Sequence, residues 1–198
     1  MADPAPPARE RFLDAALLVM RERGIANATT KLIAQRAGLS EALLYKNFDD
    51  KQHLFLCVLE ERTPRVRFDP DAAGSEDLLE ALMTLTEQLM AFFTSTFPLA
   101  ASVFGSPDLL AQHRDGVTAQ GKGPAEAVTE VRRFLDAERR AGRIRRDADT
   151  TAAARTLVGA AFHQGFLAAF SGEDDVPGSR RVAAGIAGVL LPALSAED

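Results

Sequence analysis

Apolar residues recur every three or four positions along most of this chain, which is the period of an amphipathic α-helix. The first such stretch runs from Arg9 to Arg23 and is expected to end at Gly24, because glycine readily leaves the helical conformation. The alternation typical of a half-buried strand is weak everywhere. The pattern therefore predicts an all-α fold with about nine helices.

Two short helical stretches separated by a tight turn follow between Thr29 and Phe48. Gly38 lies where the first stretch should end, because glycine adopts the left-handed conformation without a Cβ clash. Ser40 is placed to cap the next helix through its hydroxyl. Two helices joined by a short turn with glycine form a helix-turn-helix, whose second helix enters the major groove of DNA. This segment therefore predicts a DNA-binding unit.

The remaining helical stretches are separated by polar segments that contain glycine or proline. They are expected to cover residues 50–62, 76–96, 107–113, 124–141, 147–170 and 179–191. Asp49 or Asp50 is expected to cap the first of them. Phe97-Pro98 is expected to end or kink the second, because proline lacks the backbone N–H. Residues 114–123 are polar and are expected to form a loop.

The chain is expected to form two domains. Residues 63–75 hold two prolines, a glycine and few periodic apolar residues, so we expect a linker there. The N-terminal arm and helix-turn-helix then occupy residues 1–50, and a larger helical domain occupies 51–198. The helix 51–62 and the linker 63–75 connect the two.

Composition narrows the functional classes. The net charge of −5 means that nucleic-acid binding requires a local basic patch. The single cysteine, Cys57, excludes an intrachain disulfide and favours a reducing compartment. The chain has no run of about 18 apolar residues and no signal-peptide core near its start, so a cytoplasmic protein is expected. Catalytic fingerprints and metal-ligand spacing are absent from the sequence, so we expect no enzyme, no metal and no cofactor.

A longer pattern surrounds the helix-turn-helix between residues 11 and 60. Its elements, in order, are Ala15, Ala16, Gly24, Thr29, Ile33-Ala34, Ala37-Gly38-Leu39-Ser40, Leu44-Tyr45, Phe48, Lys51 and Leu54. In this order they resemble the DNA-binding head of TetR-like (tetracycline-repressor-type) transcriptional regulators. The resemblance implies a two-domain homodimer. Its first three helices bind a double-stranded DNA operator, and its C-terminal helices hold a small-molecule pocket and pair with the partner through the last two.

Most candidate DNA-binding residues lie on the second helix of the helix-turn-helix or at its start. The set is Thr29, Ser40, Glu41, Ala42, Leu43, Tyr45, Lys46, Asn47 and Lys51. Thr29 can cap its helix and touch a phosphate, while Tyr45 and Lys46 suit phosphate contacts. Lys51 matches the family's phosphate-contacting lysine, and its charge is poorly placed against the helix dipole for stability alone.

Three positions depart from the family's pattern, which usually has a lysine or arginine after the turn and then a small polar pair. Glu41 can accept a hydrogen bond from cytosine N4, or it can stabilise the helix N-terminus through the dipole. Ala42 and Leu43 replace the polar pair, and Leu43 can contact a thymine methyl or belong to the core. Asn47 can bond adenine or a phosphate. Arg9 and Arg11 can reach a minor groove or lie in a solvated tail.

The C-terminal half is rich in phenylalanine, and some of these rings can line a pocket for an apolar or aromatic effector. The candidate ligand-binding residues are Phe93, Phe97, Phe104, His113, Phe134, His163 and Gln164. The alternative is that these rings and the lone histidines are ordinary core or interface residues. Small residues beside aliphatic ones in the last two helices, such as Gly185 and Gly188, suit a dimer bundle or an intrachain core.

The expected function is a ligand-responsive transcriptional regulator. A two-fold homodimer is expected to bind a pseudo-palindromic operator and to act as a repressor that an apolar or aromatic effector releases. The alternative is a helical small-molecule- or partner-binding protein without DNA binding, which the acidic Glu41 keeps open.

Overall fold

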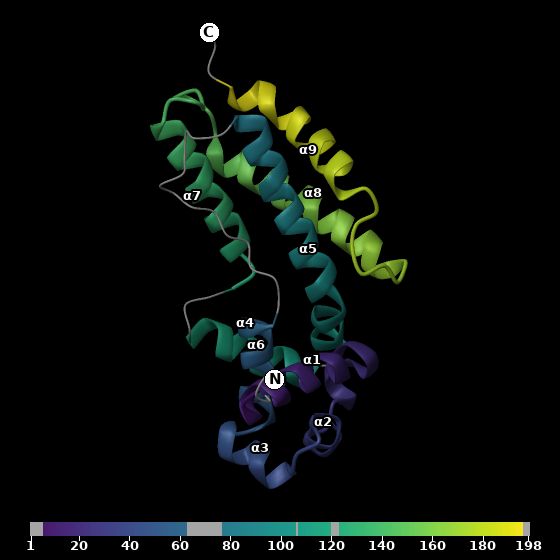
Figure 1. Ribbon diagram of the computed structural model, residues 1–198. Coiled ribbons are helices and arrows are strands. Elements are labelled where there is room, and N and C mark those ends of the chain that lie inside the picture. Colours follow the sequence, from purple (N-terminus) through teal and green to yellow (C-terminus); the bar gives the residue numbers. More distant parts are fainter. Residues whose placement is uncertain (1–5, 63–76, 106, 120–122, 196–198) are drawn as a thin grey trace, which may run out of the picture. The chain divides into compact units, whose positions relative to one another are not determined.

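The computed structural model describes residues 6–62, 77–105, 107–119 and 123–195, which form nine α-helices without a strand (Figure 1). The helices are α1 Ala8–Asn27, α2 Thr30–Ala37, α3 Glu41–Asn47, α4 Lys51–Glu61, α5 Leu78–Phe104, α6 Pro107–Ala119, α7 Glu126–Arg140, α8 Thr150–Phe170 and α9 Ser179–Leu194. The predicted all-α class and helix number are confirmed. None of the described helices is both long and apolar enough to cross a membrane.

The chain divides into two compact units, each with its own core. The first unit comprises residues 1–63 and 98–113, and the second comprises 64–97 and 114–198. The first unit thus includes α4, whereas the sequence predicts the boundary at residue 50. Helix α5 contributes residues to both units. The predicted linker at 63–75 lies outside the described residues.

The core of the first unit is built from the apolar stripes of α1, α2, α3 and α4 and from the end of α5. Phe12 and Leu13 of α1 are fully buried, and the Phe12 ring meets the Phe48 ring edge-on at 6.3 Å between centroids. Leu99 and Val103 of α5 belong to the same cluster. These buried apolar side chains hold the helix-turn-helix on a rigid base.

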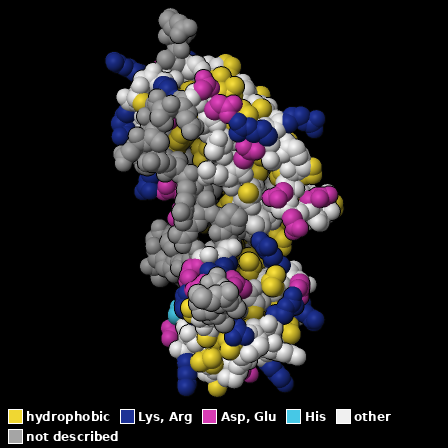
Figure 2. Space-filling model, in the orientation of Figure 1, with side chains coloured by type: hydrophobic (Ala, Val, Ile, Leu, Met, Phe, Trp, Pro, Cys, Tyr) yellow, Lys and Arg dark blue, Asp and Glu magenta, His cyan; other side chains and the backbone are white. Residues whose placement is uncertain are grey.

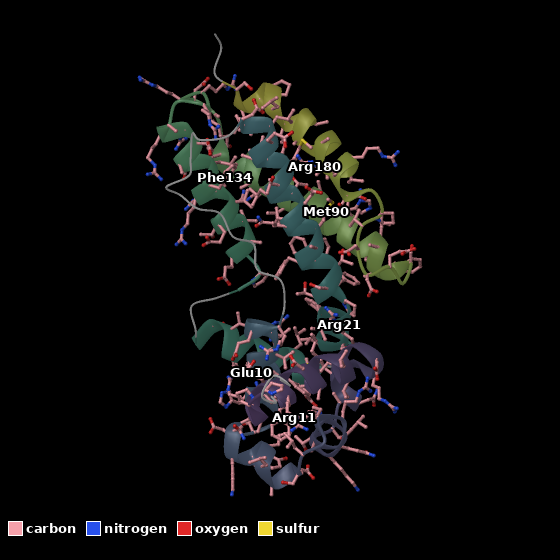
Figure 3. The ribbon with its side chains drawn as sticks, viewed as in Figure 1. Glu10, Arg11, Arg21, Met90, Phe134 and Arg180 are labelled. Atoms are coloured by element: carbon pink, nitrogen blue, oxygen red, sulfur yellow. The ribbon has the colours of Figure 1, made fainter. Side chains whose placement is uncertain are left out.

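The core of the second unit lies among α5, α7, α8 and α9. Leu89, Leu135 and Leu157 are buried there. Ala183 and Ala187 of α9 are buried in the same core. Polar contacts reinforce the packing at the start of α9: Figure 3 labels Arg180, whose guanidinium bonds Glu80 and Glu87 of α5. The long helices therefore pack along their lengths.

Several predicted helix ends are confirmed. Asp50 caps α4 by accepting from the His53 N–H at 2.7 Å, and Asp149 caps α8 in the same way. At Gly24 the backbone leaves the helical conformation with φ 75° and ψ 158°, as expected, although one further turn extends α1 to Asn27. Gly142 follows α7 with φ 81°.

Three predicted ends are wrong. Helix α5 passes through Pro98 for six more residues, because Leu99 and Val103 beyond it gain burial in the first unit. Helix α6 extends to Ala119 into the predicted loop, since the single glycine at 116 costs a helix only about 1 kcal/mol. Helix α9 continues through Pro192 to Leu194, which is buried. Tertiary burial outweighs these local breakers.

Candidate nucleic-acid interface

Side-chain caps bound both helices of the helix-turn-helix. Thr29 Oγ1 accepts from the Leu32 N–H at 3.2 Å, and Ser40 Oγ accepts from the Leu43 N–H at 3.2 Å. Gly38 at the turn has φ 66° and ψ 33°. The caps satisfy N–H groups that a helix start leaves unpaired, and glycine takes the left-handed conformation at little cost. The predicted structural roles of these residues are confirmed.

Arg11 reinforces the turn from α1. Its Nη2 donates to the Ala37 carbonyl at 2.6 Å, which satisfies one of the last acceptors of α2. A Cβ at position 38 would lie 3.1 Å from the same nitrogen. Arg11 therefore belongs to the scaffold of the turn.

Arg9 is also held within the first unit. Its guanidinium donates two hydrogen bonds to the Glu61 carboxylate at 2.8 and 2.6 Å, and it lies 5.5 Å from the centroid of the Phe48 ring. The hydrogen bond to Glu61 raises the pKa of Arg9. Neither Arg9 nor Arg11 thus has the free position that the minor-groove or solvated-tail alternatives require.

One face of α3 carries three exposed residues. Ala42, Tyr45 and Lys46 lie at positions i, i+3 and i+4 and are exposed, with 51% of Tyr45 accessible. Leu43 is half-buried and packs against the core of the first unit, which agrees with the alternative that it is a core residue. The Asn47 side chain donates to the Leu43 carbonyl at 2.8 Å. Fewer residues of α3 are therefore exposed than the sequence-based set of DNA contacts contains.

Glu41 has a partner that the sequence did not indicate. Its Oε1 accepts a hydrogen bond from Thr30 Oγ1 at 2.5 Å, and Thr30 is 9% exposed at the start of α2. The Tyr45 hydroxyl lies 3.3 Å from the same Thr30 oxygen. Glu41 thus connects α3 to α2.

The cations of the first unit fall into two groups. Arg36 pairs with Glu22, and Arg62 bonds Glu10 and Asp14. By contrast, six cations of this unit make no ion pair with any residue that the structure describes; they are Arg11, Arg21, Arg23, Lys31, Lys46 and Lys51. Lys and Arg side chains project around the end of this unit that carries α2 and α3 (Figure 2). Lys31 on α2 and Lys46 on α3 are both exposed, so the helix-turn-helix carries positive charge of the kind that an acidic chain needs for binding a polyanion.

Lys51 lies at the first position of α4. Its ammonium is 5.1 Å from the centroid of the Phe55 ring, which is a cation–π distance. Burial lowers the pKa of Lys51. The ring and the half-buried stem fix the direction of this side chain.

The arrangement agrees with a known family. Residues 12–58 match the family model of bacterial regulatory proteins, tetR family. The helix-turn-helix and the helices that flank it are therefore similar to the DNA-binding domain of this family. The HTH-type transcriptional regulator YvkB of Bacillus subtilis is 39% identical over 57 residues, which are 29% of this chain and 30% of that relative. SrpR of Pseudomonas putida is 35% identical over 81 residues, which are 40% of this chain and 38% of that regulator. The chain therefore matches well under half the length of these curated relatives.

Solved structures of TetR-type regulators resemble this chain beyond the helix-turn-helix. A TetR-family transcriptional regulator from Mesorhizobium loti superposes with a TM-score of 0.73 at 19% identity, over 96% of this chain and 97% of that one. A TetR transcriptional regulator from Agrobacterium tumefaciens gives 0.70 at 24% identity, over 97% and 96%. At these identities the likeness establishes the fold of both units.

The candidate effector residues are divided between the two units. Phe104 is 71% exposed and His113 half-buried in the first unit, where burial lowers the pKa of His113. In the second unit Phe134 is buried, and His163 is exposed. The remaining three are half-buried in that unit: Phe93, Phe97 and Gln164.

A row of rings joins α5 to α8 in the second unit. We call this the aromatic row; it consists of Phe92, Phe93, Phe162, Phe97, Phe166 and Phe170, with successive centroids 5.1 to 6.0 Å apart. It brings Phe93 and Phe97 together on the ring of Phe162. Phe162 is 46% and Phe170 81% exposed, so the row reaches the surface.

Two further positions matter for the structure and carry little signal in the sequence. At Gly165 an added Cβ would lie 2.7 Å from the Phe93 Cβ and 2.9 Å from the Thr94 nitrogen, so this glycine permits the close approach of α8 to α5. A glycine inside a helical pattern is a signal for such an approach. Thr30 was missed because no local pattern pairs it with Glu41.

Proposed function

We propose that this chain is a DNA-binding transcriptional repressor that places α3 in the major groove of its operator. The observation that carries the proposal is the capped helix-turn-helix whose second helix leaves Ala42, Tyr45 and Lys46 on one exposed face. A helix anchored in this way presents a fixed set of side chains to base edges and phosphates. The function would place the protein in the cytoplasm.

The proposed contacts follow from exposure and charge. Lys46 and the exposed cap Thr29 suit phosphates, and Ala42 suits a thymine methyl. Lys51 is held by Phe55 at the start of α4, where it can reach a phosphate beside α3. The other members of the predicted set, Ser40, Leu43 and Asn47, support the helix through their bonds and packing.

A homodimer through α8 and α9 would supply the two heads that a pseudo-palindromic operator requires. Part of the predicted face, including Leu157 and Ala161, is buried inside the chain. The other part is open: Val189 is 79% exposed, and a Cβ at Gly185 or Gly188 would meet no atom within 4 Å. Exposed aliphatic and small residues on two long helices support a tight helical interface.

We also propose that an apolar or aromatic small molecule releases the operator. The half-buried rings of the aromatic row support this class of effector, because such rings line most small-molecule sites. After the operator is known, small aromatic compounds can be screened for those that dissociate the complex. A matched screen of polar compounds of similar size should release none.

The function can be tested by selecting operators from random duplexes and measuring their binding in gel shifts at several salt concentrations. Lys46→Ala should weaken binding to all duplexes about equally and reduce the salt slope by about 1. Arg132→Ala removes the same charge from an exposed position of the second unit and should leave both unchanged. If the folded dimer enriches no duplex, the alternative of a small-molecule- or partner-binding protein would replace the proposal.

A further inference from the structure

Three side chains form a hydrogen-bonded chain across the helix-turn-helix. Thr30, buried at the start of α2, lies between Glu41 at the start of α3 and Tyr45 one turn later. The distances from Thr30 Oγ1 are 2.5 Å to Glu41 Oε1 and 3.3 Å to the Tyr45 hydroxyl. Both neighbours of Thr30 thus come from the helix proposed to enter the groove.

The donor and the acceptor in each of these two hydrogen bonds follow from the number of protons that the side chains carry. A hydroxyl has one proton to donate, and an ionised carboxylate only accepts. Thr30 therefore donates to Glu41, and its lone pairs remain to accept. In the contact between the two hydroxyls, Tyr45 is then the donor.

We propose that Glu41 is a positioning residue that sets the Tyr45 hydroxyl as a hydrogen-bond acceptor at the DNA-facing surface. With its proton committed to Thr30, the 51% exposed phenol presents only lone pairs outward. This inference rests on the proposed DNA binding by α3.

The polarity decides what Tyr45 can recognise. Phosphate oxygens only accept, so they are mismatched to an outward acceptor, whereas the amino groups of cytosine N4 and adenine N6 in the major groove donate. Tyr45 therefore contributes to base preference in place of the phosphate contact expected from sequence. The acidic residue after the turn then serves recognition without touching DNA.

The hydrogen bonds of Tyr45 can be followed by ultraviolet spectroscopy without DNA, because Tyr45 is the only tyrosine and the protein has no tryptophan. Thr30→Val removes the acceptor of the Tyr45 proton, and Glu41→Ala removes the group that orients Thr30. Both should shift the near-ultraviolet absorption of Tyr45, while Thr30→Ser should keep the wild-type spectrum. An unchanged spectrum in folded Thr30→Val, with folding checked by its melting temperature, would overturn the proposal.

The closing experiment measures the preference of each variant among selected operators and their single-base variants. Thr30→Val and Glu41→Ala should each reduce discrimination at one position per half-site by about two- to tenfold, as for a single hydrogen bond. Neither should add to the loss in Tyr45→Phe, because all three changes break the same chain. Asp49→Ala, which removes an exposed carboxylate outside the chain, should change affinity for all duplexes alike.

Two failures are distinguishable. If wild type enriches no duplex, the proposed function fails, and the inference fails with it. If wild type binds operators but Tyr45→Phe weakens all duplexes equally, or the effects of the three changes add, DNA binding stands and the positioning role of Glu41 is wrong.

Discussion

The two units of the chain are stabilised in different ways. In the first, α2 and α3 have 8 and 7 residues, well below the roughly 12–15 residues at which isolated helices become even marginally stable. Their ends therefore matter, and Thr29, Gly38 and Ser40 fix them. The second unit contains residues 78–97 of α5, which has 27 residues, and all 21 residues of α8, and these long helices depend on how closely they approach. The short helices of the first unit thus depend on the geometry of their ends, and the long helices depend on the size of the side chains between them.

The largest expected effect comes from Gly165→Ala in the second unit. The new methyl would lie 2.7 Å from the Phe93 Cβ and 2.9 Å from a backbone nitrogen, so α8 must move away from α5. Overpacking of this kind typically costs about 1–3 kcal/mol. The free energy of unfolding from urea denaturation measures it.

Gly159→Ala is the matched control on the same helix, because an added Cβ there meets nothing within 4 Å. It should stabilise the chain by up to about 1 kcal/mol, since alanine is the better helix former. Equal effects of the two substitutions would show that the approach at Gly165 is not tight.

A smaller loss is expected from Gly38→Ala in the first unit. A φ of 66° costs an alanine about 1–2 kcal/mol, and the methyl would also press on Arg11. Gly142→Ala in the second unit has the same backbone problem at φ 81° without any atom nearby. Thermal unfolding of both should show a larger loss for Gly38→Ala, and the reverse order would contradict a role for Arg11.

Removing a cap should separate stability from DNA binding. Ser40→Ala and Asp149→Ala each delete a cap, which costs about 0.5–2 kcal/mol. Only Ser40→Ala should also weaken operator binding, because α3 has few other bonds to hold its first turn. Gel shifts at a temperature where both variants are folded would test this. Equal operator affinity of the two variants would contradict the prediction that only the cap of α3 matters for DNA binding.

The smallest effect concerns pH. Burial lowers the pKa of His113 in the folded chain, because the buried imidazole is favoured in its neutral form. The contribution of this neutral side chain to the free energy of unfolding is therefore fully present above the unfolded pKa of about 6.5. The contribution is lost as the pH falls from there through the lowered folded value. His113→Gln should flatten the pH dependence of the free energy of unfolding in this window, as measured by urea denaturation at several pH values.

Features set by neighbouring residues could be predicted from the sequence. The caps at Thr29 and Ser40 and the left-handed Gly38 depend on groups within a few positions and follow from the sequence, which also narrows the cap of α4 to Asp49 or Asp50. The passage of α5 through Pro98 was not, because its cause is burial of Leu99 and Val103 among helices far away in sequence. The same limit applies to Glu41, whose partner Thr30 lies 11 residues away across the turn.

The first unit is discontinuous in sequence, so it can complete its folding only after a later part of the chain has been synthesised. Leu99 and Val103 complete a core whose other members lie mainly within the first 58 residues. On the ribosome, α1 to α4 would therefore emerge with one side of their core uncovered, and about 40 more residues must follow before α5 can close it. A fragment that stops at residue 63 would expose the same apolar surface, so the shortest soluble form of the head should retain residues 98–113.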